Sequence, residues 1–208
     1  WLVDSREKAE ELFHTQLERL DRDYVDFYLL HSLSRRTWTQ MVELNIPSLL
    51  EEYQRQGKIR KLGFSFHDDY EVFEEILRFR HWDFCQIQLN YMDTEHQAGL
   101  KGLELARGLG VPVVVMEPVK GGLLAKLPEE VAAPLRVLDP EASDASWALR
   151  WVASRPGAAV LLSGMTTMEQ LEDNLATLGQ FRPLCPEEEA GVDETTLLLK
   201  QRVKNGCT

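Results

Sequence analysis

The sequence predicts an α/β protein built on a parallel β-sheet. Five strand-like runs, about 25 to 45 residues apart, are each followed by a helix-like segment, and this alternation is typical of βα units. No glycine-rich phosphate loop follows an early strand, as an open doubly wound sheet would require. We therefore expect a (β/α)8 barrel that lacks its first three strands, because a whole barrel needs eight strands and about 250 residues.

Short runs of bulky or β-branched residues mark the strands. The fourth run, VPVVVME, has the unbroken apolar character of a strand that is buried on both faces. The last run, AAVLLS, ends at a serine. The five expected strands are residues 24–31, 58–66, 84–90, 111–117 and 158–163.

Apolar positions at helical spacing mark the segments between the strands. Asp4 or Ser5 caps the first helix, whose apolar positions run from Ala9 to Leu20. Gly57 and Gly108 follow or close two of the later helices, as expected of helix ends. Those later helices are expected at residues 39–56, 69–79, 94–108, 144–154, 167–178 and 187–203, with one helical turn near 129–136.

Composition excludes several classes of protein. The 208 residues include 23 Lys and Arg against 34 Asp and Glu, a formal net charge of −11, which disfavours non-specific binding to nucleic acid or anionic membranes. No apolar run approaches the roughly 20 residues of a membrane span. Cys85, Cys185 and Cys207 are odd in number and widely spaced, which indicates a reducing, cytoplasmic compartment. No histidine or cysteine pair has metal-ligand spacing, so we expect no metal site.

Polar residues close the predicted strands at their carboxyl ends, where a barrel builds its active site. They are His31, Ser65, Asn90, Glu117 and Ser163. Any strand that leaves a core meets water and turns polar, so one such residue carries little weight. Five in succession are as consistent with an active-site rim as with that simpler explanation.

His31 ends an apolar strand. If its side chain points into the barrel, those of Val25, Phe27 and Leu29 do too, because side chains alternate along a strand. An inward imidazole could donate a hydrogen bond to a substrate oxygen. The alternative is a histidine that is bonded to a neighbouring loop carbonyl.

Two features favour phosphate binding. Gly121 and Gly122 have no side chains to keep backbone N–H groups from a pyrophosphate, although a flexible loop explains them equally well. The last strand is followed by a tight turn and by a helix that begins near Thr167, and the free N–H groups of a helix start attract phosphate. Loops after the last strands of a barrel, together with a helix N-terminus, are a recurrent phosphate site.

Five segments in this order resemble the aldo-keto reductases. They are LERLDRDYVDFYLLH (17–31), GKIRKLGFSFHD (57–68), CQIQLNYMD (85–93), VPVVVMEPVKGGLL (111–124) and LLSGMTTMEQLEDNL (161–175). The segments LLHS, GFSFHD and MEPVKGG are similar to those of a bacterial branch of the family, which carries a ferredoxin-like cysteine segment after the barrel. The resemblance implies NAD(P)H as cofactor, a small-molecule carbonyl compound as substrate, and hydride transfer to or from the carbonyl carbon.

The resemblance also implies roles for individual residues. His31 would help to place the substrate carbonyl. Ser65 and Gln86 would hold the nicotinamide carboxamide, and Met116 would lie against the nicotinamide face. The pyrophosphate loop would consist of Glu117, Pro118, Gly121, Gly122 and Leu123. The adenosine-phosphate segment would consist of Ser163, Gly164, Met165, Gln170, Asp173 and Asn174.

The chain departs from the family pattern in three respects. The catalytic Tyr, Lys and Asp of the family lie on strands before the one that ends in His31, so the chain as given is expected to be inactive. Phe66 stands where the family often has Asn, which weakens the expected carboxamide contact. Gly164 and Gln170 stand where NADPH-selective members have Lys or Arg. Without a cation the 2′-phosphate has no bidentate partner, so NADH is at least as plausible as NADPH.

We expect residues 1–183 to form the partial barrel, strands 4–8 of the family pattern, and residues 184–208 to form a C-terminal helix that leads toward a truncated cysteine segment. An iron–sulfur cluster is expected only in a longer parent chain. The absence of three strands would expose two sheet edges, which invite self-association. Two alternatives stay open: a non-catalytic, cofactor-binding or regulatory protein on the same barrel, and a folded remnant of a longer enzyme.

Overall fold

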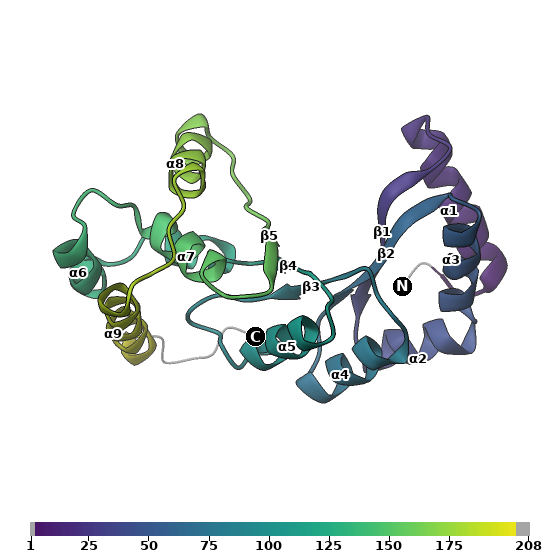
Figure 1. The fold of residues 1–208 in the computed structure, drawn as a ribbon, viewed down its shortest axis with the longest axis horizontal. Coiled ribbons are helices and arrows are strands. Elements are labelled where there is room, and N and C mark those ends of the chain that lie inside the picture. The colour runs from purple at the N-terminus through teal and green to yellow at the C-terminus, as the bar shows by residue number, and fades with distance from the viewer. Residues whose placement is uncertain (1–2, 203–208) are drawn as a thin grey trace.

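The computed structural model describes residues 3–202. Its five strands form one sheet, in which all neighbours are parallel and the spatial order follows the chain (Figure 1). The strands are β1 (Val25–Leu33), β2 (Ile59–Phe66), β3 (Phe84–Gln88), β4 (Val113–Met116) and β5 (Ala158–Leu161). The predicted α/β fold is confirmed, and the sheet is that of a partial (β/α)8 barrel.

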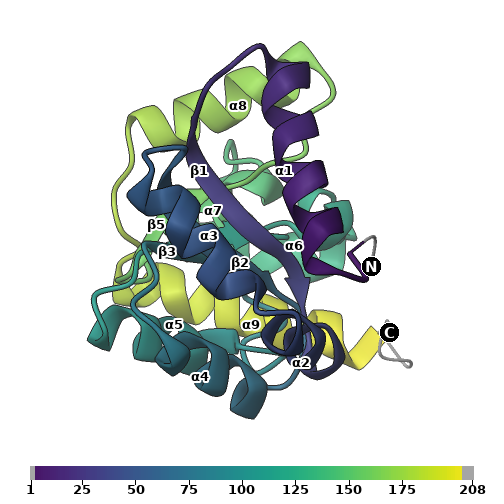
Figure 2. The same cartoon turned by 90° about the vertical axis from the view of Figure 1, so that its right-hand side faces the viewer.

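Helices connect the strands and cover one face of the sheet, as Figures 1 and 2 show. They are α1 (Arg6–Leu20), α2 (Arg35–Glu43), α3 (Ile46–Arg55), α4 (Tyr70–Phe79), α5 (Gly99–Gly108), the short 3₁₀ helix η1 (Lys120–Ala125), α6 (Glu129–Leu138), α7 (Asp144–Ala153), α8 (Met168–Gly179) and α9 (Pro186–Arg202). The last helix packs against α6. The predicted cysteine segment at Cys207 lies outside the described residues.

The prediction of one helix over residues 39–56 is wrong, because two helices, α2 and α3, occupy this region. Asn45, between them, has a left-handed backbone with φ of 53°, and Pro47 lies in the first turn of α3. Proline fits a first turn, where its missing N–H has no partner to lose, and is unfavourable inside a helix. The chain therefore turns at Asn45 and starts a new helix.

The segment between β4 and α7, which was predicted to hold one helical turn near residues 129–136, contains more helical structure than that. It forms η1 and then α6, a helix of 10 residues that begins after Pro128. The two glycines at 121 and 122 lie inside η1 with non-helical, left-handed backbones. The loop after β4 is therefore a defined turn rather than an irregular connection.

The helices bury the outer face of the sheet, whereas its inner face is partly open. Phe64, Ile87 and Val115 point outward and are completely buried. On the inner face, Phe27 of β1 is 68% exposed and Val160 of β5 is 48% exposed. Within the described residues, β1 and β5 each pair with one strand only, so the sheet has two edges.

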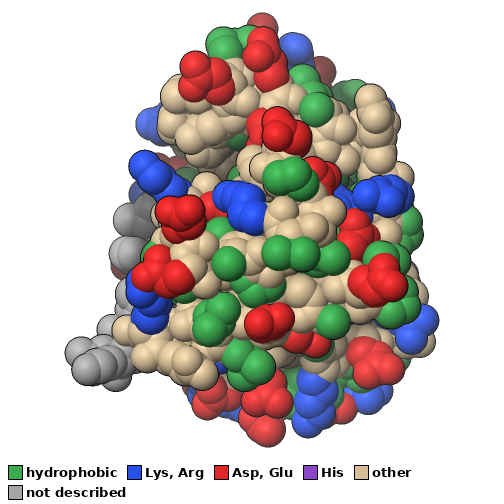
Figure 3. Space-filling view, turned by 90° about the vertical axis from the view of Figure 1, so that its left-hand side faces the viewer, with side chains coloured by type: hydrophobic (Ala, Val, Ile, Leu, Met, Phe, Trp, Pro, Cys, Tyr) green, Lys and Arg blue, Asp and Glu red, His purple; other side chains and the backbone are tan. Residues whose placement is uncertain are grey.

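Charges of both signs are mixed over the face of the molecule that Figure 3 shows, with hydrophobic side chains between them. Ion pairs link α9 to its neighbours, Arg155 to Glu189 on one side and Arg202 to Glu130 on the other. Among the helices of residues 3–202, none is long and apolar enough to cross a membrane.

Candidate active site

The four residues predicted for the nicotinamide and carbonyl site lie on four neighbouring strands, with Gln86 in the middle of β3 and the other three at or near the carboxyl ends of their strands. Ser65 is in register with Gln86 on the next strand, and Gln86 Nε2 lies 3.4 Å from Met116 Sδ. The N–H of Ser32, next to His31, donates to Ser65 Oγ at 2.7 Å. The fold therefore brings these predicted site residues to one end of the sheet.

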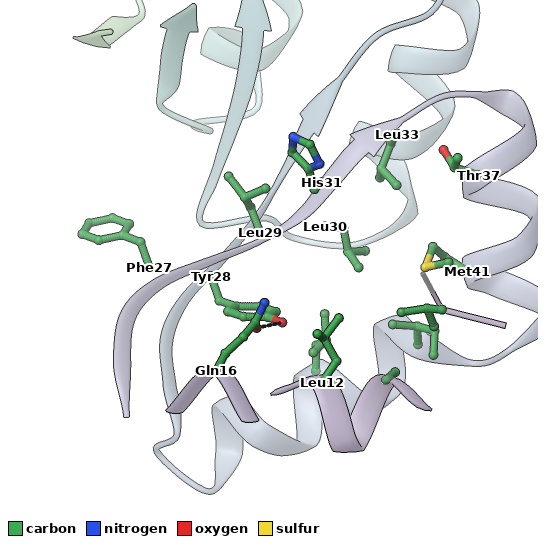
Figure 4. A pocket seen from close by; sticks show the side chains of 14 residues that line it. Leu12, Gln16, Phe27, Tyr28, Leu29, Leu30, His31, Leu33, Thr37 and Met41 are labelled. Atoms are coloured by element: carbon green, nitrogen blue, oxygen red, sulfur yellow. Dashed lines mark hydrogen bonds between the residues drawn. The ribbon is translucent and has the colours of Figure 1, made fainter. Parts of the chain in front are cut away.

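β1 presents His31 on its inner face. Figure 4 shows Phe27, Leu29 and His31 projecting to one side of the strand, while Tyr28 points toward α1. There the Tyr28 hydroxyl donates to Gln16 Oε1 at 2.8 Å. The alternation predicted for this strand is confirmed, and the exposed imidazole of His31 lies on the inner side of the sheet.

A bulge extends β1 beyond its predicted end. Ser32 has a left-handed backbone with φ of 55°, and the pairing with β2 shifts between Leu30 and Leu33. Ser65 Oγ, on a residue that is 1% exposed, accepts the N–H of Ser32. This contact fixes the backbone next to His31 and leaves the Ser65 hydroxyl its own hydrogen to donate.

A second imidazole, that of His67, lies near His31 at this end of the sheet. The backbone N–H of His67 donates to Leu33 O at 2.9 Å. Burial lowers the pKa of His67, and nearby His31 lowers it further, whereas the Glu117 carboxylate opposes both effects. A lowered pKa favours the neutral imidazole, which can both donate and accept a hydrogen bond. The sequence places His67 at the end of the same predicted strand, two positions after Ser65, but sequence reasoning gave it no role in the site.

A cavity of about 340 Å³ lies between the loop after β4, the end of β5 and the start of α8. Its lining consists of Glu117, Pro118, Val119, Gly121, Gly122, Ala125, Ala145, Leu162, Ser163, Gly164, Met165, Gln170, Asp173 and Asn174. Every residue predicted for the two phosphate segments is among them except Leu123, which is 42% exposed. The two segments therefore form one cavity.

The loop after β4 has an unusual backbone. Glu117 and Lys120 have φ of 58° and 48°, and Gly121 and Gly122 follow with 60° and 95°. The N–H of Lys120 donates to Glu117 O at 3.0 Å, and those of Gly122 and Leu124 donate to Val119 O at 3.0 and 3.1 Å, so the loop is a tight turn that is held by its own backbone. The two glycines leave the cavity side of this turn without side chains, so a ligand can approach its backbone closely.

The start of α8 is held by side-chain hydrogen bonds. Thr167 Oγ1 accepts the N–H of Gln170 at 3.3 Å, and Gln170 Oε1 accepts the N–H of Thr166 at 2.8 Å. Asn174 Nδ2 donates to Ser163 Oγ at 2.9 Å and so ties the helix to the end of β5. The partial positive charge of a helix N-terminus therefore lies beside the cavity.

The cavity carries negative rather than positive side chains. Glu117 and Asp173 line it, and no Lys or Arg of the described chain does. Asp173 Oδ2 accepts a hydrogen bond from Ser143 Oγ at 2.6 Å, which connects α8 to the cap of α7. A ligand phosphate must therefore rely on backbone N–H groups and hydroxyls.

Tyr91 does not fit the role of a proton donor. It is 3% exposed, and its ring packs against Trp151 with centroids 6.5 Å apart. Burial and the Asp144 carboxylate raise its pKa above the ordinary value. Its hydroxyl has no hydrogen-bond partner within residues 3–202. A buried phenol with a raised pKa cannot reach a substrate oxygen on the inner face.

No metal centre is formed by the described residues, since they contain no group of three or more His, Cys, Asp or Glu in suitable positions. Cys85 is buried in β3, where burial raises the pKa of its thiol to about 12. Cys185 is exposed and belongs to a different region. The described cysteines therefore do not supply the ligands of an iron–sulfur cluster.

Parallel strands in chain order, polar residues at their carboxyl ends and a phosphate-type cavity beside a helix start define an α/β protein of the barrel type. The chain belongs to the Aldo/keto reductase family, whose model matches residues 3–196. The family consists of NAD(P)H-dependent oxidoreductases of small carbonyl compounds.

Individual relatives agree with this membership. The NADH-specific methylglyoxal reductase of Escherichia coli is 26% identical over 200 residues, which are 84% of this chain and 60% of that protein. L-galactose dehydrogenase of Arabidopsis thaliana is 25% identical over 93% of this chain and 63% of its own length. The chain thus spans about 60% of the length of these relatives.

Solved structures show the same fold. The holo form of an aldo-keto reductase from Bacillus halodurans matches with a TM-score of 0.74 at 24% identity, over 94% of this chain and 69% of that one. An aldo-keto reductase from Klebsiella pneumoniae in complex with NADPH matches with a TM-score of 0.69 at 22% identity, over 91% of this chain and 65% of that one.

Proposed function

We propose that this chain supplies the cofactor side of an NAD(P)H-dependent aldo-keto reductase that transfers hydride to or from the carbonyl carbon of a small molecule. The observation that carries the proposal is the 340 Å³ cavity, where the glycine loop, the end of β5 and the start of α8 meet. Such a cavity suits a ligand with phosphate groups. The similarity to an NADH-specific reductase supports the same reaction class.

In this proposal the nicotinamide half of the cofactor lies over the strand ends. Ser65 donates its hydroxyl hydrogen to the carboxamide, and the Gln86 amide, held against Met116 Sδ, bonds to its other side. Met116 packs against the ring. The bound dinucleotide supplies the hydride. His31, exposed on the inner face, donates a hydrogen bond that orients the substrate oxygen.

The phosphate half of the cofactor occupies the cavity. The N–H of Gly121 and the start of α8 bind the pyrophosphate, because a helix N-terminus directs N–H groups at an anion. The N–H of Gly122 donates to Val119 O at 3.0 Å and holds the turn itself. Ser163 and Asn174, bonded to each other, hold the adenosine side. The negative lining gives a 2′-phosphate no cation to pair with, so NADH binds at least as tightly as NADPH.

A cation at Gly164 should reverse this preference. A Cβ added at Gly164 meets no atom within 4 Å, so Gly164→Arg is tolerated and places a guanidinium at the cavity. We expect NADPH affinity to rise by about tenfold relative to NADH, because arginine binds phosphate with two parallel hydrogen bonds. Fluorescence titration with both cofactors measures the ratio.

The matched control is Gly179→Arg, at another glycine with open space around its Cβ but outside the cavity. It should leave the ratio unchanged. A wild-type chain that binds neither cofactor contradicts the proposed function. Tighter binding of NADPH than NADH by the wild-type chain contradicts only the proposed preference.

The chain alone should reduce carbonyl compounds poorly. The family's acid–base residues lie on other strands, and Tyr91 is buried away from the site, so the acid–base contribution of about 10²–10⁴-fold is lost. Consumption of NADH with methylglyoxal as substrate, followed by absorbance, measures this. Turnover by the 208-residue chain at a rate typical of enzymes, about 1–10³ s⁻¹, would contradict the expectation.

We further propose that the open edge of β1 allows copies of this chain to associate. The edge leaves backbone N–H and C=O groups unpaired. Phe27 is 68% exposed beside it, and a groove of about 800 Å³ follows the strand (Figure 4). Light scattering should show dimers or larger species that decrease in Phe27→Lys. Val137→Lys, at an exposed site on α6, is the control and should not change association.

A further inference from the structure

Asp93 joins the loop after β3 to the loop after β4. Its carboxylate forms an ion pair with Lys120, and Oδ2 also accepts hydrogen bonds from Gln88 Nε2 and Asn90 Nδ2, each at 3.4 Å. Asn90 Nδ2 also donates to Glu117 O at 3.2 Å. We call these five residues the clamp. The Asp93 and Lys120 side chains are 17% and 19% exposed, so water screens their interaction only in part.

The clamp includes the two non-glycine residues of the β4 loop that have left-handed backbones. Glu117 and Lys120 have φ of 58° and 48°, a conformation that persists in residues with a Cβ only where the surroundings fix it. Asn90 bonds to the carbonyl of Glu117, and Asp93 pairs with the ammonium group of Lys120. The clamp therefore sets the path of the backbone into the glycine pair.

Lys120 itself does not line the cavity, although Val119 and Gly121 on either side of it do. Its ammonium group is held by Asp93, on a different loop. The one cation within residues 117–122 therefore acts on the shape of the loop and not on the contents of the cavity.

We propose that Asp93 and Lys120 are positioning residues for the dinucleotide. Their ion pair holds the loop after β4 in the conformation in which the Gly121 N–H receives the pyrophosphate. This inference rests on the proposed function of the cavity, and it adds two residues, neither in the cavity lining, on which cofactor affinity depends.

Removal of the charge on Asp93 tests the inference. Asp93→Asn keeps the size of the side chain and should weaken NADH binding about five- to tenfold, because a charge-assisted hydrogen bond is lost. Lys120→Met should do the same. The double variant should be no weaker than the weaker single variant, because both changes remove one interaction. Amide hydrogen exchange in residues 117–125 should accelerate in all three.

The matched control is Glu189→Gln, which breaks the ion pair with Arg155, of similar exposure, between α9 and the turn after α7. It should change neither NADH affinity nor exchange in the β4 loop. Unchanged affinity and exchange in Asp93→Asn overturn the inference. Tighter NADH binding by Asp93→Asn also overturns it, because Lys120 would then act on the phosphates when released. If the wild-type chain binds no NADH, the proposed function fails. Hydrogen exchange then tests only whether the clamp holds the β4 loop in place.

Discussion

Glu188→Gln should lower the free energy of unfolding by about 3 kcal/mol, the cost of breaking a buried ion pair from one side. The Glu188 side chain, 9% exposed, accepts hydrogen bonds from Arg150 Nη2 at 2.9 and 2.8 Å and from the N–H of Cys185 at 2.9 Å. A neutral amide would leave the Arg150 charge, on a side chain that is 10% exposed, without its counter-ion. Urea unfolding followed by circular dichroism measures the loss.

Two controls separate burial from charge. Asp26→Asn breaks an ion pair with Arg60 in which the side chains are 58% and 59% exposed, and exposed pairs contribute only about 0–1 kcal/mol. Replacement of both Arg150 and Glu188 by Met should cost much less than Glu188→Gln, because no unpaired charge stays buried. Equal losses for Glu188→Gln and Asp26→Asn would contradict the argument.

The contribution of Glu188 should also depend on pH. Burial acts to raise the pKa of Glu188, but the Cys185 N–H and the Arg150 guanidinium outweigh it, so the pKa lies below 4.5. A lowered pKa stabilises the fold above the ordinary value and loses that effect as the pH falls through the folded-state pKa. The stability difference between wild type and Glu188→Gln should therefore be full at pH 7 and shrink as the pH falls below about 4.

The sheet could be predicted from local patterns, but its irregularities could not. Five β-branched or bulky runs separated by helical segments are enough to give parallel strands in chain order. The bulge at Ser32 depends on Ser65 Oγ, a contact across 33 positions of sequence, so no local pattern encodes it. The break at Asn45 could have been predicted from the sequence, because Pro47 favours the first turn of a new helix.

Most residues that line the cavity could be predicted from sequence motifs, whereas the residues that reach the site from other elements could not. The two phosphate segments are contiguous stretches whose glycines and helix start have a direct physical meaning. Ala145 reaches the cavity from α7, and Asp93 reaches Lys120 from another loop. Such residues have ordinary sequence surroundings, and only the tertiary fold brings them to the site.

Gly122→Val should weaken NADH binding at least tenfold. Gly122 has φ of 95° and ψ of −6°, where a β-branched residue is strained by about 1–3 kcal/mol. A Cβ at this position meets no atom within 4 Å, so the effect comes from the backbone and not from overpacking. We expect the loop to relieve the strain by changing its backbone path and with it the shape of the cavity, and 1.4 kcal/mol of lost binding corresponds to about tenfold.

Gly179→Val provides the comparison, because that glycine also has open space around its Cβ, lies at the end of α8 and does not line the cavity. Its φ is not left-handed, so valine adds no comparable strain there. Fluorescence titration of NADH with both variants, each checked by thermal unfolding, separates the site from the fold. Equal affinities in the two variants would mean that the backbone at Gly122 does not shape the phosphate site. A large loss in Gly122→Val alone, with unfolding little changed, would support the proposal that the backbone of this turn shapes the phosphate site.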